Sequence, residues 1–495
     1  MPTTAKRGLS ILGAAALLGV IGELLLRAAP WGINVVIWLA LVVAGLAGLA
    51  RVQSVPLAGP GRWLLAPALL FALGLAWRDS PALAALNILA TLLLLMLAAA
   101  WARASDIRRA GLLEYAIDVF QAGLHAAYAP LALIFQDISW RQVVPGDGER
   151  RAAPAILRGL LIALPLLFVF GALFAAADAG FEQLVNNLFN WDIEDLIEHA
   201  VFAGFLGWLV AAFLRQTLLI KRWSARFSQF APPFRLGGIE IMTVLALLNA
   251  LFAVFVLLQF RYLFGGLAEL ARSETLTYAE YARRGFFELV TVAALLLPLL
   301  LLLHWLLRRE ESGRERWFRI LSSALLALLF AVMASAMQRM WLYQQQYGLT
   351  ELRIYTTAFM FWLAVVGAWF AATVLRGRRE CFAFGALLAG LVMIALLNAL
   401  NPDALIVRTN QSRAEAQPFD ARYAGSLSAD AVPDLIAALP SLPEAERCLA
   451  AARILREWTP PQNADWRTWN WSRSRAWDAV VANEATLGAL ACDER

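Results

Sequence analysis

Hydrophobic residues along this chain are gathered into blocks of about 20, separated by short polar connections. An α-helix of about this length crosses a hydrocarbon core roughly 30 Å thick. The pattern therefore predicts an all-α fold, a polytopic transmembrane bundle followed by a small helical domain outside the membrane. The eleven predicted spans are 8–28, 32–50, 63–77, 81–101, 156–178, 199–220, 239–263, 285–307, 318–342, 354–376 and 382–400.

Segment 111–129 has a different pattern from the spans. Glu114, Asp118, Gln121 and His125 recur at intervals of four, three and four residues, so they share one helical face. Apolar residues occupy the opposite face, which is typical of an amphipathic helix lying along the cytoplasmic membrane surface. The alternative is a polar stripe that lines a pore or docks a partner.

After residue 400 the apolar blocks give way to polar and turn-forming residues. Helices are predicted there at 431–439, 442–457 and 474–490, the second opened by a capping box from Ser441 to Glu444. The chain is thus divided into a four-span part (1–110), the amphipathic helix and a loop (111–155), a seven-span core (156–400) and a helical domain (401–495).

Basic residues predict the orientation of the spans. With the N-terminus inside, the inner connections hold 23 Lys and Arg residues, and the outer connections before residue 401 hold 8. Since Lys and Arg accumulate on the cytoplasmic side, this predicts a cytoplasmic N-terminus. Eleven crossings then leave the helical domain on the outer, periplasmic side.

Composition agrees with a membrane protein and limits the classes of binding partner. Of 495 residues, 61% are hydrophobic and 16% charged, against about a quarter charged in soluble domains. These values exclude a disordered chain and a disulfide-rich mini-protein. The net charge is +5, made of +8 over residues 1–400 and −3 over 401–495. The basic excess therefore belongs to the membrane part and indicates orientation, not nucleic-acid binding.

Cysteine and histidine residues show no metal-binding pattern. There is no CxxC, and the three histidines are far apart in sequence, so no metal and no cofactor are predicted. Cys448 and Cys492 both fall in the outer domain. In an oxidising compartment they can pair and close a loop of 44 residues, and the alternative is two free thiols.

A few polar residues lie inside the apolar spans, where each is costly in lipid. We interpret Asn87, Asn249 and Asn398 as hydrogen-bonding contacts between helices rather than substrate ligands. Glu23 and Arg27 are four residues apart near the end of the first span and are expected to pair locally.

Charged residues also gather at the outer ends of spans seven to eleven. Two interpretations are open: an outward-facing polar pocket, or a structural belt of ion pairs that holds the outer domain. The candidate site residues are Glu280, Arg283, Arg284, Glu288, Arg339, Glu351, Arg353, Asp403 and Arg408.

The common enzyme signatures are absent from the sequence. It contains no GxxxxGK[ST], HExxH or GxSxG motif. This favours a non-enzymatic protein, and no catalytic residue is assigned. The alternative is a membrane enzyme in which Glu280 or Glu288 acts as acid or base beside Arg283, Arg284 and Arg353.

Five stretches of the sequence resemble a known family. They are Phe170–Asp178, Asn249–Gly266, Thr277–Glu288, Arg339–Arg353 and Asn401–Arg413. The chain is similar over roughly residues 155–425 to the bacterial membrane family of unknown function DUF4173, formerly classed with DUF4153. The resemblance implies a multi-pass protein of the bacterial inner membrane. It implies no established activity.

Together these observations predict an integral inner-membrane protein with an outward-facing polar site. Its expected partners are the lipid bilayer and an envelope protein or small solute on the periplasmic side. The first function class is a non-enzymatic envelope module, meaning a transporter-like, sensor or scaffold protein. The second is an enzyme acting on a lipid-linked or envelope substrate.

Overall fold

The computed structural model describes most of the chain. The described residues are 3–57, 59–102, 107–108, 110–138, 193–220, 236–264, 286–307, 312–413 and 419–492, with single positions between 159 and 181.

Long apolar helices make up the body of the molecule, and the predicted all-α polytopic bundle is confirmed. Eleven described helical segments are long and apolar enough to cross a membrane. Ten of them coincide with predicted spans, and the eleventh is Leu112–Asp137. The predicted span 156–178 lies almost wholly outside the described residues. The span helices are α1 (Thr3–Leu26), α2 (Ile33–Val52), α3 (Leu65–Trp77), α4 (Pro81–Ala100), α9 (Ile193–Leu218), α10 (Gly238–Phe264), α13 (Phe286–Leu306), α14 (Ser312–Tyr347), α15 (Glu351–Thr373) and α16 (Phe382–Leu400).

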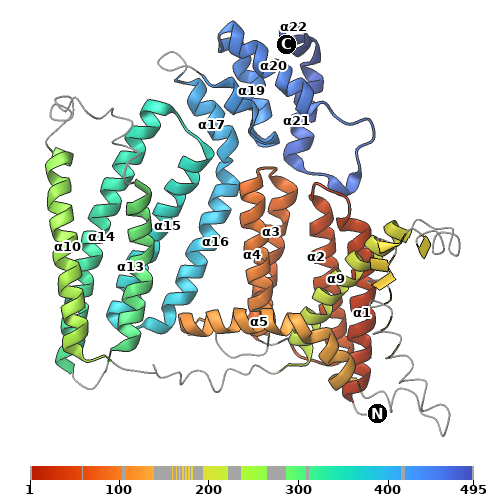
Figure 1. Cartoon of the computed structure of the whole chain (residues 1–495), viewed down its shortest axis with the longest axis horizontal. Helices are drawn as coiled ribbons and strands as arrows, with labels where there is room; N and C mark the ends of the chain where they lie inside the picture. The colour runs from red at the N-terminus through yellow and green to blue at the C-terminus, as the bar shows by residue number, and fades with distance from the viewer. Residues whose placement is uncertain are drawn as a thin grey trace.

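Helix α5 (Leu112–Ala132) lies crosswise to its neighbours α3 and α4 (Figure 1). Leu113, Phe120 and Leu124 are exposed along it, whereas Asp118 is buried. By length and hydropathy α5 qualifies as a span, but its crosswise direction is the one expected of a helix lying along a membrane surface.

Most span helices form two groups, and α3 and α4 lie between these groups, in contact with α2 and α16 (Figure 1). In the first, α1, α2 and α9 pack around Ile11, Leu46 and Leu214. Helices α1 and α9 approach closely because both present glycine at the crossing: a Cβ on Gly19 would lie 2.8 Å from the Cα of Gly207. In the second group, α10, α13, α14 and α15 share one apolar core, and α16 contacts both α15 and α4.

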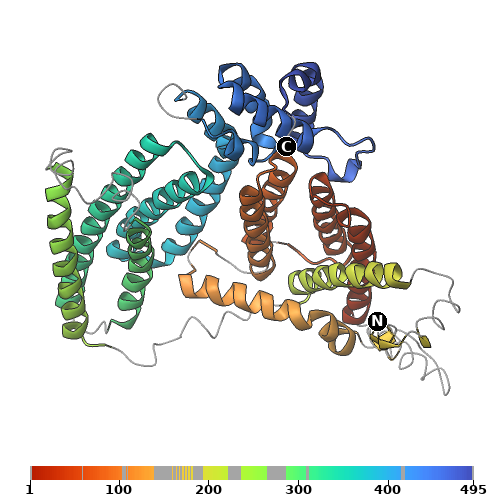
Figure 2. The ribbon, with the colours of Figure 1, turned by 45° about the horizontal axis from the view of Figure 1, so that its top comes forward.

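The C-terminal part is a cap of short helices over α3, α4 and α16 (Figure 2). Its core includes Ile406, Leu435 and Ile454, and it continues into the bundle through Leu83 and Leu397. The cap therefore shares its apolar core with the membrane helices. It comprises α17 (Pro402–Gln411), α18 (Ala421–Gly425), α19 (Val432–Ala438), α20 (Glu444–Trp458), α21 (Trp471–Ala482) and α22 (Glu484–Leu490).

Helix boundaries in the cap agree with the sequence pattern in two of three cases. The predicted helices 431–439 and 442–457 correspond to α19 and α20. The predicted capping box is wrong: no side chain caps α20, and the Ser441 hydroxyl instead donates to the carbonyl of Ala438. The predicted helix 474–490 is divided at Asn483 into α21 and α22.

A disulfide joins Cys448 in α20 to Cys492, just after α22. Their Cα atoms are 5.2 Å apart, a separation ordinary for a disulfide. The bond links the last helix of the cap to its longest one. Cys381 lies at the N-terminus of α16, the end away from the cap, and is a free thiol.

Candidate functional site

Four buried charged residues and one half-buried carboxylate, Asp79, meet where the turn between α3 and α4 contacts the cap. We call Arg78, Asp79, Asp403, Asp430 and Arg473 the junction cluster. Arg78 and Asp79 come from the α3–α4 turn, and the other three come from the cap. The cluster therefore spans the boundary between the membrane helices and the C-terminal helices.

Asp430 is the centre of the cluster. Its side chain is fully buried and accepts five hydrogen bonds, two on Oδ1 and three on Oδ2. The two backbone donors lie immediately before α4, at the helix N-terminus, which attracts negative charge. The donors are Arg78 Nη1 at 3.1 Å, Ser472 Oγ at 2.6 Å, the N–H groups of Asp79 at 2.7 Å and Ser80 at 3.1 Å, and Ser428 Oγ at 3.3 Å.

Arg473 links the cluster to a third element, the turn between α1 and α2. Its Nη2 donates to the carbonyl of Trp31 at 3.0 Å, and its Nε lies 3.2 Å from Asp79 Oδ1. Burial raises the pKa of Asp79 from 3.8 to about 6, although the Arg473 guanidinium acts in the opposite direction. Asp79 therefore changes protonation near neutral pH.

Asp403 is the second fully buried carboxylate of the cap. Its Oδ2 accepts bonds from the N–H and the hydroxyl of Ser428, at 3.2 and 2.5 Å, and the single hydroxyl proton is shared with the longer contact to Asp430. Its Oδ1 has no hydrogen-bond partner among the described residues. Burial raises the pKa of Asp403, and the nearby Asp430 carboxylate raises it further, against the lowering by Ser428.

The Asn470 side chain forms hydrogen bonds with backbone groups at the ends of two helices, α21 and α3. Its Oδ1 accepts the N–H of Arg473 and so caps α21, while its Nδ2 donates to the carbonyls of Leu75 and Arg78 at 2.8 and 2.9 Å. These carbonyls lie at the end of α3 and have no partner within that helix. One amide thus fixes the cap on the bundle at a defined angle.

A pair of amides lies below the cluster. Asn87 in α4 and Asn398 in α16 donate to each other's Oδ1 atoms, both at 3.0 Å. Arg78 Nε connects this pair to the cluster by donating to the Asn398 carbonyl at 2.7 Å. Asn249 donates across to the Leu321 carbonyl in α14. The predicted role of these three asparagines as contacts between helices is confirmed.

Of the candidate residues from sequence, Asp403 lies in the junction cluster. Glu351 lies near it, with its backbone N–H donating to the Tyr423 hydroxyl at 2.9 Å. Arg353 caps the end of α14 by donating to the Tyr347 carbonyl at 2.9 Å, and its guanidinium stacks 4.2 Å above the Tyr343 ring.

The remaining candidates lie apart from the cluster. Arg408 does not join the cluster and instead forms a two-bond ion pair with Asp434 on the surface. Arg339 Nη2 donates to Gln259 at 3.1 Å, between α14 and α10. Glu288 is exposed. Glu280, Arg283 and Arg284 lie outside the described residues.

Sequence reasoning missed four of the five cluster members. Arg78 and Asp79 offered a signal, because they are adjacent charges in a three-residue turn between two apolar spans. Asp430 and Arg473 offered little, since both lie in a tail where charged residues are common. Their partners in the bundle are more than 300 residues away in sequence.

Arg27 and Glu23 pair at the end of α1, as expected, and Arg27 also contacts α9. Arg27 Nη1 lies 3.9 Å from Glu23 Oε1. Arg27 also reaches Asp195 and Glu198 of α9, at 3.4 and 3.3 Å. His199 contacts Glu23 from the same helix. These contacts support the α1–α9 packing.

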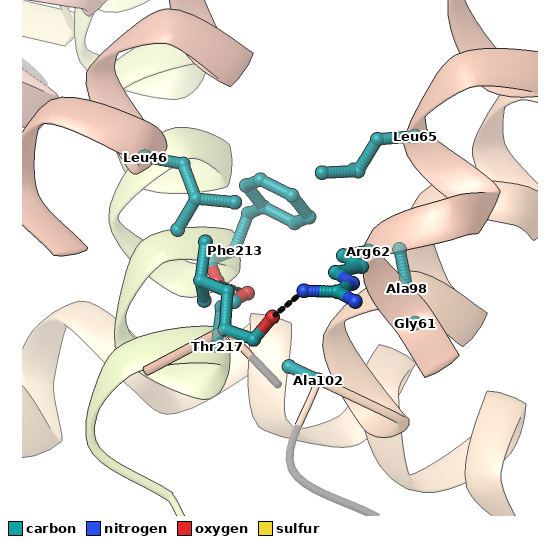
Figure 3. Close-up of a pocket in the computed structure, with 9 residues that line it drawn as sticks. Leu46, Gly61, Arg62, Leu65, Ala98, Ala102, Phe213 and Thr217 are labelled. Carbon is teal, nitrogen blue, oxygen red and sulfur yellow. Dashed lines mark hydrogen bonds between the residues drawn. The ribbon is translucent and has the colours of Figure 1, made fainter. Parts of the chain in front are cut away.

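Two apolar clefts open among the span helices. The one we call the lateral cleft has a volume of about 780 Å³ and lies between α3 and α16, with Trp77, Trp469 and Trp471 at its outer end. The second has about 720 Å³ and lies between α4–α5 and the second helix group. A third space, beside Arg62, Phe213 and Thr217, has only about 10 Å³, too little for a ligand (Figure 3).

Eleven apolar helical segments with a polar junction at one end define an integral membrane protein. Residues 65–438, well over half of the chain, match the sequence model of a family described as a domain of unknown function, DUF4153, and the chain belongs to that family. The predicted resemblance to a family of unknown function is thereby confirmed. No curated protein and no solved structure matches the chain. The matched region runs from the start of α3 to the end of α19 and includes Arg78, Asp79, Asp403 and Asp430.

Proposed function

We propose that this protein is a non-enzymatic module of the bacterial inner membrane, in which the bundle holds the cap at the periplasmic surface as a sensor or scaffold. The observation that carries this proposal is the bonding of Asp430. Its two oxygens are occupied by five donors from three segments of the chain. A general acid or base must reach a substrate, whereas a buried carboxylate bonded in this way holds elements together.

Three observations support the membrane placement. Basic residues favour the side opposite the cap. Trp31, Trp77, Trp469 and Trp471 are exposed near the junction, as tryptophans at a membrane–water interface are. The disulfide of the cap is of a kind that persists in an oxidising compartment such as the periplasm. A reporter fused after residue 495 tests this, because a cytoplasmic signal would overturn the orientation.

Complementation of a deletion strain distinguishes a module from an enzyme. The module requires that Asp430→Ala, which releases the cap, fails to complement at a normal protein level. It also requires that Glu288→Gln, which leaves the junction intact, complements fully. Loss of function in Glu288→Gln, with normal abundance and a docked cap, would instead support an enzyme acting on a lipid-linked or envelope substrate.

A further inference from the structure

The lateral cleft has the composition of a site for hydrocarbon. Its walls come from four of the candidate membrane spans and are apolar apart from the Asn87–Asn398 pair, whose amides bond to each other. Water is poorly held by such walls, because an apolar cavity offers it no hydrogen bonds. At the depth of the spans, the available apolar material is the acyl chain of a lipid.

The cleft is open to the side. Leu70 and Leu73 of α3 and Leu388 and Val392 of α16 line it and remain 44–65% exposed. Exposed apolar side chains on both walls allow a lipid to enter from the bilayer without passing through water. The cleft therefore differs from a closed cavity of the protein interior.

The outer end of the cleft carries features that suit a lipid headgroup. Trp469 and Trp471 belong to the cap and close the cleft above the bundle. Arg475 is four residues after Trp471 in α21, so it lies on the same helical face and about 6 Å farther along the axis. Its side chain is exposed.

Arg475 differs from Arg78 and Arg473, which lie next in sequence to Trp77 and close to Trp471. Arg78 is paired with Asp430, and Arg473 is paired with Asp79. Within the part of the chain that the structure describes, Arg475 makes no hydrogen bond or ion pair. It is therefore available to an external anion.

We propose that the lateral cleft binds an anionic glycerophospholipid, with one acyl chain between α3 and α16 and the headgroup phosphate beside Arg475. Burial of the acyl chain stabilises the complex, and Arg475 makes binding selective for a lipid with an anionic headgroup. This proposal depends on the membrane placement of the bundle. It does not depend on the role of the cap as sensor or scaffold, or on which side of the membrane the cap faces.

The test uses the full-length protein in phosphatidylcholine nanodiscs that contain a small fraction of photoactivatable lipid. One sample carries labelled phosphatidylglycerol and another carries labelled phosphatidylcholine, and crosslinked peptides are identified by mass spectrometry. We expect labelling on both walls of the cleft, at 64–77 and 384–398. Phosphatidylglycerol should give about five times as much crosslinked peptide as phosphatidylcholine. Equal labelling by the two lipids, or labelling that avoids these segments, would overturn the proposal.

Two variants with matched controls distinguish the contribution of the lipid acyl chain to binding from that of the headgroup. Ala395→Trp fills the lateral cleft and should abolish labelling of its walls, while Ala294→Trp fills the second cleft and should leave it unchanged. Arg475→Gln should lower phosphatidylglycerol labelling to the phosphatidylcholine level, and Arg422→Gln, elsewhere on the cap, should not. Unchanged labelling in Arg475→Gln would refute the headgroup contact. The comparison of the two lipids on the native chain remains decisive if Ala395→Trp does not fold.

Discussion

Replacing Asp430 by alanine is the sharpest perturbation of the junction. The change removes the acceptor for five donors, among them the charged guanidinium of Arg78. Arg78 is only 9% exposed, so water does not readily replace the lost carboxylate. The buried cation and the N–H groups at the start of α4 are then left without their partner.

The expected cost follows from burial. Removing one member of a buried ion pair costs about 3–5 kcal/mol, because the other charge stays buried and uncompensated. At 1.36 kcal/mol per tenfold, undocking of the cap should become roughly 150- to 5,000-fold more frequent. The surface pair of Arg408 with Asp434 provides the comparison, since Arg408 is 67% exposed and such pairs contribute about 0–1 kcal/mol.

Amide hydrogen exchange measures this opening directly. In nanodiscs, peptides covering 428–435 and 470–480 should exchange faster in Asp430→Ala by the factor given above, up to the intrinsic rate. Peptides of α14 should be unaffected, and Asp434→Ala should resemble the native chain. If Asp430→Ala and Asp434→Ala exchanged alike at the junction, the inference that this ion pair holds the cap would be wrong.

Three further predictions concern the cap and the bundle. Because the pKa of Asp79 is raised to about 6 in the folded protein, its stabilising contribution is full below about pH 3.8 and is lost as the pH rises through 6. Junction exchange, corrected for the intrinsic rate, should therefore increase from pH 4 to pH 7, and a pH response unchanged in Asp79→Asn would contradict this. Cys448→Ser should remove a mobility shift on reduction and cost about 4 kcal/mol for a 44-residue loop, whereas alkylation of both native thiols without reductant would show that no bond forms. Asn87→Leu should lower the free energy of unfolding by about 1–2 kcal/mol, because Asn398 loses its partner. If the effects of Asn87→Leu and Asn398→Leu were additive in the double variant, the two amides would not interact.

The candidate site illustrates where sequence reasoning succeeds and where it stops. Asp403 was singled out as one of the charged residues that gather at the outer ends of spans seven to eleven, and the structure places it in the junction cluster, near the start of α17. The same reasoning selected Arg408 for the same site. The structure pairs Arg408 with Asp434, because α19 packs beside α17 and offers an accessible carboxylate.

The sequence by itself determined the membrane helices and the polar residues that join them. A span must be about 20 apolar residues long, and an asparagine inside one must find a partner, so both are visible in the local pattern. The junction cluster was decided by the tertiary structure alone. Asp430 bonds to the α3–α4 turn about 350 residues earlier in the chain. A charge in a polar tail looks the same whether it faces water or fills a buried site, and only the packing of the cap on the bundle distinguishes the two.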